Sequence, residues 1–305
     1  MEAPAKINLG LRIVGVREDG YHRLESVFVP LDWFDEIRVV VGPGSSPRVD
    51  LTCRPAADAP ERAHSEVPDG PSNLAHRAAS RFLEKSGRAA SIEIDLTKRL
   101  PAAAGLGGGS SDAGAVLRAL AEIWPQDLSR SELGELALSL GADVPFFLDP
   151  TPSLVTGIGE EIQPVPGFPG LTVLLANPGK PLATAEVFRA WDDGFPSLTP
   201  ATPGSTLRAL SRFLGRDLEH LGRDHRVLND LLVNDLEEAA QGLCPELGGL
   251  LAGLAESGAQ SVSMSGSGAT IFGVFDSFEQ AQSAQKKLAL GDSGWSRLAA
   301  SHPGR

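Results

Sequence analysis

The sequence predicts an α/β protein of two domains, and three observations support this prediction. The chain has 305 residues, about twice the usual length of one domain, and 42% of them are hydrophobic, enough for a substantial core. Segments with the periodicity of strands alternate with segments that have the periodicity of helices. No unit of roughly 20 to 50 residues repeats, which argues against a solenoid.

Three segments of the first half have the pattern of strands: 7–14, 36–41 and 91–96. Residues 42–71 are rich in Pro, Gly, Ala and Asp and predict a loop with one short strand. Three segments have the apolar spacing of helices: 73–86, 111–123 and 130–140. Asn73 is suited to cap the first of these helices, and Ser129 with Glu132 has the spacing of a capping box before the third.

The second half of the chain also mixes strands and helices. Strands are predicted at 171–176, 261–264 and 270–275. Helices are predicted at 184–191, 226–241, 246–257 and 277–288, with a Pro-, Ser- and Thr-rich loop at 192–206. The last strands and helix resemble a split βαβ sandwich. We place the domain boundary at residue 155, which gives domains of residues 1–155 and 156–305.

Composition excludes several classes of protein. The formal net charge is −12, and a protein of this charge lacks the basic face that duplex nucleic acid requires. The two cysteines, Cys53 and Cys244, are too few for a disulfide framework, which favours a reducing compartment. No apolar run reaches the roughly 20 residues of a membrane span, and the first residues lack the core of a signal peptide. We therefore expect a cytoplasmic protein without a membrane partner.

The strongest local signal is the small-residue stretch between Pro101 and Asp112, which contains four glycines and two serines. It follows a predicted strand and opens a predicted helix, where backbone amides can surround a phosphate. It has neither the Lys–Ser/Thr pair of the Walker pattern nor the spacing G-x-G-x-x-G. The alternative is a tight turn that uses glycine for packing, but so many glycines and serines favour a phosphate loop.

A second glycine-rich segment, Ser263–Thr270, lies between two short predicted strands. A glycine-rich hairpin without a binding role is the alternative interpretation. Neither glycine-rich segment contains the G-x-S-x-G nucleophile elbow, which argues against a serine hydrolase.

Three further positions are unusual for their surroundings. Lys6 lies in an apolar segment, where an unpaired lysine is unfavourable, unless it is an edge-strand lysine that extends to solvent. Asp143 lies beside Val144 and two phenylalanines, either as a base or as an ordinary turn residue. Tyr21 and His22 follow Asp19-Gly20 in a turn, where surface residues would be the ordinary interpretation.

Together these segments resemble the GHMP kinases, the superfamily of galactokinase, homoserine kinase and the mevalonate kinases. Three motifs of that superfamily match in order, at Pro4–Leu9, Pro101–Ser111 and Ser265–Thr270. The pattern Arg17-x-Asp19-Gly20-Tyr21-His22-x-Leu24-x-Ser26 is similar to the members that phosphorylate a cytidine-diphosphate-linked methylerythritol in the non-mevalonate route to isoprenoids. Residues 141–147, 157–160 and 234–237 are similar to those members as well.

The resemblance implies a fold, a co-substrate and roles for single residues. The fold would combine an N-terminal part like the second domain of ribosomal protein S5 with a ferredoxin-like C-terminal part. ATP and Mg²⁺ would be required. ATP-binding residues would be Asn73, Lys98, Pro101, Ala102, Ala103, Ala104, Gly105, Leu106, Gly107, Gly108, Gly109, Ser110 and Ser111. Asp143 would accept the proton of the 2-hydroxyl and Lys6 would orient it and neutralise charge. Ser110 or Ser111 could hold the metal.

The second substrate has its own implied residues. Tyr21 and Phe188 would lie on the two faces of cytosine, and His22 would bind its polar edge. Other implied contacts of this substrate are Asn8, Thr184, Gly266, Ser267 and Gly268. Ala183 stands where the family often has serine, so Thr184 would make that contact alone.

Two other functions stay open at this stage. Another small-alcohol kinase of the superfamily is disfavoured by the turn at Asp19–His22, and a non-catalytic nucleotide sensor is disfavoured because Lys6 and Asp143 are both present. The sequence does not separate a monomer from a homodimer. It also assigns no role to the excursion at 42–71.

Overall fold

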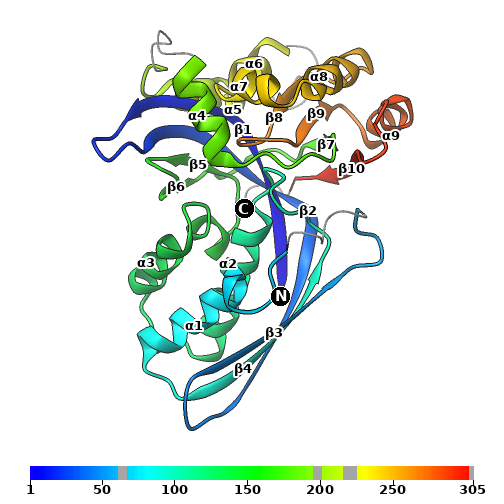
Figure 1. Cartoon of the computed structure of the whole chain (residues 1–305). Coiled ribbons are helices and arrows are strands. Elements are labelled where there is room, and N and C mark those ends of the chain that lie inside the picture. The colour runs from blue at the N-terminus through cyan, green and yellow to red at the C-terminus, as the bar shows by residue number, and fades with distance from the viewer. Residues whose placement is uncertain (61–66, 195–200, 216–224, 302–305) are drawn as a thin grey trace. The chain divides into compact units, whose positions relative to one another are not determined.

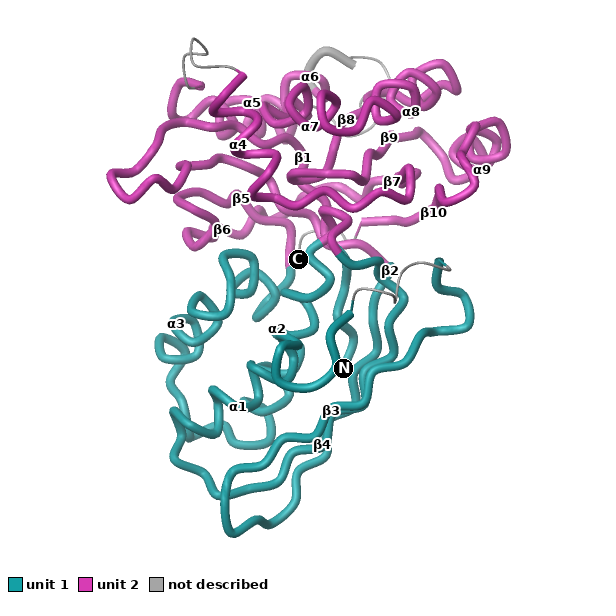
Figure 2. The backbone as a smooth tube through the Cα atoms, in the orientation of Figure 1, with its two compact units in different colours: residues 1–5, 33–102, 107–150 teal, residues 6–32, 103–106, 151–305 magenta. Residues whose placement is uncertain are grey.

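The computed structural model of the chain describes residues 1–60, 67–194, 201–215 and 225–301 (Figure 1). The chain forms two compact units (Figure 2). The first unit contains residues 1–5, 33–102 and 107–150, and the second contains residues 6–32, 103–106 and 151–305. The predicted division at residue 155 stays a prediction, since neither unit is continuous in sequence.

In its described residues, the first unit combines strands with three α-helices. Its strands are the first residues of β1 (Glu2–Val16), the second half of β2 (His22–Pro43), β3 (Arg48–Pro55) and β4 (Ala90–Lys98). Its helices are α1 (Leu74–Ser86), α2 (Gly108–Ile123) and α3 (Arg130–Leu140), with short 3₁₀ turns at Gly70–Ser72 and Pro145–Leu148. β2 pairs antiparallel with β4 from Glu36 onward, and β3 pairs parallel with β4.

Alternating residues give β4 one apolar face, as its sequence predicts. Ile92, Ile94 and Leu96 are buried in one core cluster with Ala78 and Phe82 of α1. The helices α1 and α2 cover this face of the sheet (Figure 1). The Asn73 side chain accepts a hydrogen bond from Ala75 N, which confirms the predicted cap of α1. The capping box before α3 is also confirmed.

The second unit contains a four-stranded antiparallel sheet in the order β10-β7-β9-β8. The second unit also contains the greater part of β1 and the first half of β2. Its remaining strands among the described residues are β5 (Ser153–Thr156), β6 (Glu161–Pro164), β7 (Thr172–Asn177), β8 (Ser261–Met264), β9 (Ile271–Phe275) and β10 (Trp295–Ala300). Its helices are α4 (Thr184–Gly194), α5 (Ser205–Leu214), α6 (His225–Leu231), α7 (Glu237–Leu243), α8 (Glu246–Glu256) and α9 (Phe278–Lys287). β5 pairs with residues 26–28 of β2 and forms a hairpin with β6.

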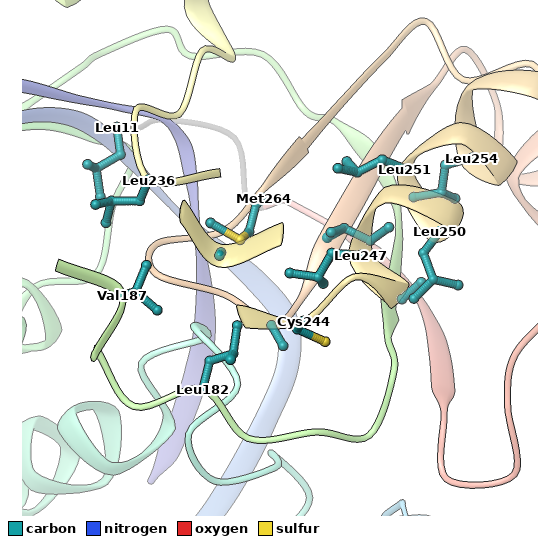
Figure 3. Close-up of a cluster of buried hydrophobic side chains, with 14 of the residues drawn as sticks. Leu11, Leu182, Val187, Leu236, Cys244, Leu247, Leu250, Leu251, Leu254 and Met264 are labelled. Atoms are coloured by element: carbon teal, nitrogen blue, oxygen red, sulfur yellow. The ribbon is translucent and has the colours of Figure 1, made fainter. Parts of the chain in front are cut away.

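The core of the second unit is built mainly from leucines and small residues. Leu247, Leu250, Leu251 and Leu254 are buried on α8, close to Met264 at the end of β8 (Figure 3). Their spacing of three and four residues is that of one helix face. This core supports the turn that follows β8, which carries the second glycine-rich segment.

The α/β fold class is confirmed, and several element boundaries are corrected. The strand predicted at 36–41 extends over the whole of β2, and β10, α5 and the β5–β6 hairpin were not predicted. The helix predicted at 226–241 is wrong as one helix: it is divided into α6 and α7 at Asn234. Of the predicted loop 192–206, residues 192–194 belong to α4, residues 205–206 belong to α5, and residues 195–200 lie outside the described residues. Within the predicted excursion 42–71, the expected short strand is β3, and residues 61–66 lie outside the described residues.

None of the described helices is both long and apolar enough to cross a bilayer.

Candidate functional site

The first glycine-rich segment makes the connection from β4 to α2. Gly105 and Gly107 have φ angles of 75° and 71°, in the region that favours glycine. Gly107 is the N-cap of α2, and Ser111 N donates the helical hydrogen bond to Gly107 O at 2.8 Å. α2 therefore begins at Gly108 rather than at the predicted residue 111. The amides of its first residues have no partner within the helix, so this end of α2 is suited to an anion.

The two glycine-rich segments meet in the second unit. Ser265 Oγ donates a hydrogen bond of 2.8 Å to Gly105 O, although 160 residues separate them in the chain. A Cβ atom on Gly105 would lie 2.3 Å from Ser265 O and 2.9 Å from Gly268 O. Only glycine permits this approach of backbone to backbone. Ser263–Thr270 forms the turn between the antiparallel strands β8 and β9 and packs on the first glycine-rich segment, and its binding role stays a prediction.

Lys6 and Asn8 lie on β1 beside these segments and are 3% and 2% exposed. Lys6 N donates to Leu106 O at 3.0 Å, and Asn8 N donates to Ser265 Oγ at 3.2 Å. Lys6 Nζ donates to Asn8 Oδ1 and lies 4.5 Å from the centre of the Phe28 ring. Lys6 is therefore a buried lysine held between a polar and an aromatic partner, and not an edge-strand lysine that extends to solvent.

Hydrogen bonds from Asn8 and Asn234 complete this part of the second unit. Asn8 Nδ2 donates to Ser26 Oγ at 3.0 Å. Asn234 Nδ2 donates to Met264 O and to Gly266 O, both at 2.8 Å, and so fixes the turn after β8. A Cβ on Gly266 would lie 3.2 Å from Asn8 Oδ1 and 3.8 Å from Lys6 Nζ. The structure thus brings Lys6, Asn8, Gly105 and Gly266 together.

The residues predicted for base recognition form a second group in the same unit. His22 Nε2 lies 2.8 Å from Asp192 Oδ1, and the His22 ring stacks on Phe188 at 4.9 Å between centroids. Trp191 contacts the His22 ring edge-on at 5.4 Å. Tyr21 is 61% exposed, which leaves its ring available to a ligand. Thr184 Oγ1 and Ser267 Oγ are 2.9 Å apart, so two predicted substrate contacts are hydrogen-bonded to each other.

Asn73 and Lys98, both predicted to lie near the nucleoside, are buried in the first unit and already have protein partners. Asn73 caps α1, and its Nδ2 donates to Pro68 O at 2.9 Å. Asp143 is half-buried in the turn between α3 and the 3₁₀ turn at Pro145–Leu148. Because Asp143 belongs to the first unit and Lys6 to the second, their pairing stays a prediction.

Three ionisable side chains are buried together in the first unit. Lys98 Nζ donates to Asp112 Oδ2 at 2.7 Å and also to Asp35 Oδ2, and the three residues are 0–3% exposed. Burial raises the pKa of the Asp112 carboxyl to about 8, against the lowering effect of Lys98 and with a further increase from Asp35. Burial lowers the pKa of Lys98, but Asp112 and Asp35 together raise it above its usual value.

Several of these residues had no predicted role. Ser26 belongs to the motif at 17–26 and Asn234 to the motif at 234–237, but the spacing of residues in these motifs does not predict which residues the two side chains contact. Asp192 is one acidic residue among many on helix surfaces. Asp35 and Asp112 are 63 and 14 residues from Lys98, so only the fold shows that they meet. Among the described residues, no three His, Cys, Asp or Glu side chains form a metal-binding group.

Two family models match the chain. The model described as GHMP kinases N terminal domain matches residues 73–149, and the model described as GHMP kinases C terminal matches residues 207–291.

Relatives of nearly the full length carry one name. The chain is 37% identical over 296 residues to the 4-diphosphocytidyl-2-C-methyl-D-erythritol kinase of Citrifermentans bemidjiense, which covers 96% of this chain and 95% of the relative. It is 40% identical over 295 residues to the protein of the same name from Deinococcus radiodurans, and this alignment covers 96% of this chain and 89% of the relative.

Solved structures agree with these relatives. A crystal structure of 4-(cytidine 5'-diphospho)-2C-methyl-D-erythritol kinase aligns with a TM-score of 0.76 and 36% identity, covering 100% of this chain and 99% of that one. The mevalonate kinase of L. major aligns with a TM-score of 0.71 at 18% identity, and the alignment covers 99% of this chain and 95% of that one. The second likeness concerns the fold alone.

Proposed function

Because the chain belongs to the 4-diphosphocytidyl-2-C-methyl-D-erythritol kinase family of the GHMP kinases, we propose that it carries out this family's reaction with the residues described above. The reaction transfers the γ-phosphoryl group of ATP to the 2-hydroxyl of 4-diphosphocytidyl-2-C-methyl-D-erythritol. The products are the 2-phosphate and ADP, in the methylerythritol phosphate route to isoprenoid precursors. The observation that carries the residue assignment is the meeting of both glycine-rich segments with Lys6 and Asn8 in one unit.

The loop at 101–111 is proposed to bind the ATP phosphates. The amides at the start of α2 and the positive end of its dipole favour a polyanion. A Cβ atom on Gly108 would lie 3.3 Å from Leu100 Cβ and 3.5 Å from Lys98 Nζ, so these two side chains pack closely against the first turn of α2. Direct contacts of Asn73 and Lys98 with the nucleoside stay predictions, since both side chains have partners inside the protein.

A magnesium ion fits the oxygen atoms at the start of α2. Ser111 Oγ is a buried polar atom with no hydrogen-bond partner in the part of the chain that the structure describes. Oxygen donors of this kind, together with phosphate oxygens, are the ligands that Mg²⁺ takes. We propose that the hydroxyl of Ser110 or Ser111 holds the ion, which would neutralise charge on the phosphates.

Asp143 and Lys6 are proposed as the catalytic pair. Asp143 would accept the proton of the attacking 2-hydroxyl as general base. Lys6 would orient this hydroxyl and stabilise negative charge on the transferred group. Its contacts with Asn8 and Phe28 hold the ammonium in one place, and such preorganisation is what phosphoryl transfer requires.

The group around His22 is proposed to recognise cytosine. A base would stack on Tyr21 and Phe188, while His22, fixed by Asp192, would bind its polar edge. Thr184 and the turn Gly266–Gly268 would border the substrate near Asn8. A cytoplasmic location and a monomeric or homodimeric state complete the proposal as predictions from the sequence.

Acceptor competition tests this function against the two alternatives. Purified protein is supplied with ATP and with the cytidylyl methylerythritol, mevalonate or homoserine in parallel, and ADP release is measured. We expect kcat/KM for the cytidylyl substrate to exceed the others by several orders of magnitude. Equal use of mevalonate would favour another member of the superfamily. ATP binding without turnover of any acceptor would favour a nucleotide sensor.

A further inference from the structure

We propose that Asp35, Lys98 and Asp112 form a buried brace that positions the glycine-rich loop for ATP, with Asp112 as a positioning residue that never touches the nucleotide. This inference rests on the proposed ATP-binding role of the loop. It concerns residues of the first unit for which sequence reasoning gave no role or a different one.

The brace holds the chain where the loop begins. Asp35 Oδ1 accepts hydrogen bonds from Arg99 N at 2.5 Å and from Leu100 N at 2.9 Å, the two residues between β4 and Pro101. The other carboxylate oxygen of Asp35 accepts from Lys98 Nζ. One buried carboxylate therefore fixes both the backbone at the start of the loop and the lysine that precedes it.

The brace also holds the chain where the loop ends. Asp112 lies in the first turns of α2, and its Oδ2 accepts from Lys98 Nζ at 2.7 Å. Lys98 is the last residue of β4, and this hydrogen bond connects it to the helix whose first amides are proposed to bind the phosphates. Because both ends are tied to one ammonium group, the position of α2 relative to the loop entry is set by two charged hydrogen bonds.

A purely structural role explains this cluster poorly. Two carboxyl groups share one ammonium in a site that is 0–3% exposed, and Asp112 Oδ1 has no partner among the described residues. Burial of such groups carries a large desolvation penalty, and apolar side chains of similar volume often stabilise a fold as well or better. An arrangement that is unfavourable for stability and lies beneath a binding loop indicates a positioning role.

The test uses three variants of Asp112 and a matched control. Asp112→Ala and Asp112→Leu both remove the tie from Lys98 to α2, and leucine fills the space that alanine leaves. Asp112→Asn keeps an acceptor oxygen for Lys98. Asp127→Ala removes another carboxylate of the same unit, the partner of Arg88 Nη2 at 2.7 Å, which is not part of the loop.

Two quantities are measured: the Kd of a non-hydrolysable ATP analogue by calorimetry, with Mg²⁺ and with EDTA, and the KM of each substrate. Asp112→Ala and Asp112→Leu should raise the analogue Kd and the KM of ATP by about tenfold, the effect expected when one charge-assisted hydrogen bond that fixes the loop is lost. The KM of the cytidylyl substrate should stay within about twofold, although thermal stability falls because one partner of a buried ion pair is removed. Asp112→Asn should restore most of the affinity, and Asp127→Ala should bind the analogue like the parent.

Three results would contradict the proposed positioning role of the brace. The first is a folded Asp112→Ala or Asp112→Leu protein with unchanged analogue Kd. The second is an equal loss of affinity for both substrates, which indicates general loosening. The third is a loss seen only with Mg²⁺, which makes Asp112 a metal ligand. If the parent binds the analogue but phosphorylates no acceptor, the proposed function fails, while the analogue titration still tests the brace.

Discussion

Replacing Gly105 with alanine adds one methyl group where the glycine-rich loop lies against the turn at Ser265–Gly268. Its Cβ would lie 2.3 Å from Ser265 O and 2.9 Å from Gly268 O, and the φ angle of 75° is unfavourable for alanine. Both clashing atoms belong to the backbone, so no side chain can rotate away. The loop or the turn has to move by roughly 0.7 Å to restore a tolerable contact.

Gly167→Ala is the matched control within the same unit. Gly167 has a φ angle of 69°, and a Cβ there would meet nothing within 4 Å. The control measures backbone strain alone, about 1 kcal/mol. Gly105→Ala adds a clash in a packed site, and we expect a total loss of about 2–4 kcal/mol in the free energy of unfolding. Because Gly105 contacts Ser265 and lies beside Gly266, a proposed substrate contact, kcat should fall by about 10–100-fold.

Urea unfolding and steady-state ADP release measure these two effects. The contact between the segments predicts that Gly105→Ala is less stable than Gly167→Ala and that it alone loses kcat. The reasoning is wrong if the two variants are equally stable and Gly105→Ala turns over within twofold of the parent.

Three further predictions concern the site and its charges. Tyr21→Ala should raise the KM of the cytidylyl substrate by the loss of one stacking contact, about 1–3 kcal/mol, with little change in the KM of ATP; equal weakening of both substrates would make the turn a structural support. Asp143→Asn should lower kcat by about 10²-fold, at the low end for a general base, with the KM values nearly unchanged; activity within threefold of the parent would remove Asp143 from the mechanism. The pKa of Asp112 is raised from 3.8 to about 8 by burial, so its contribution to stability is fully present below pH 3.8 and is lost as the pH rises through 8. The free energy of unfolding should therefore decrease between about pH 5 and 8 more steeply in the parent than in Asp112→Asn, and parallel profiles would contradict the shift.

The local patterns of the sequence predicted the elements whose contacts are local. The alternation in β4, the cap at Asn73 and the capping box before α3 depend on neighbouring residues, and all three are confirmed. β2 was predicted too short because only its residues 36–41 are rich in β-branched side chains. Pro30 lies between the residues that pair with β5 and those that pair with β4.

Long-range contacts decided the elements that sequence patterns missed. The helix predicted at 226–241 is interrupted because Asn234 uses its side chain to bind Leu236 N and the carbonyls of Met264 and Gly266. The brace around Lys98 is invisible for the same reason, since each of its three residues is unremarkable in its own segment. The motifs indicated which segments carry the chemistry, and only the fold showed how Gly105 and Ser265 meet.

The most direct test of the proposed function is the identity and stoichiometry of the product. The purified protein is incubated with ATP, Mg²⁺ and 4-diphosphocytidyl-2-C-methyl-D-erythritol, and the products are followed by phosphorus NMR and mass spectrometry. We expect one new phosphate ester on the 2-hydroxyl for each ADP formed, and about a hundredfold slower product formation with Asp143→Asn. ADP formation without a phosphorylated acceptor, or a phosphate on another hydroxyl, would contradict it.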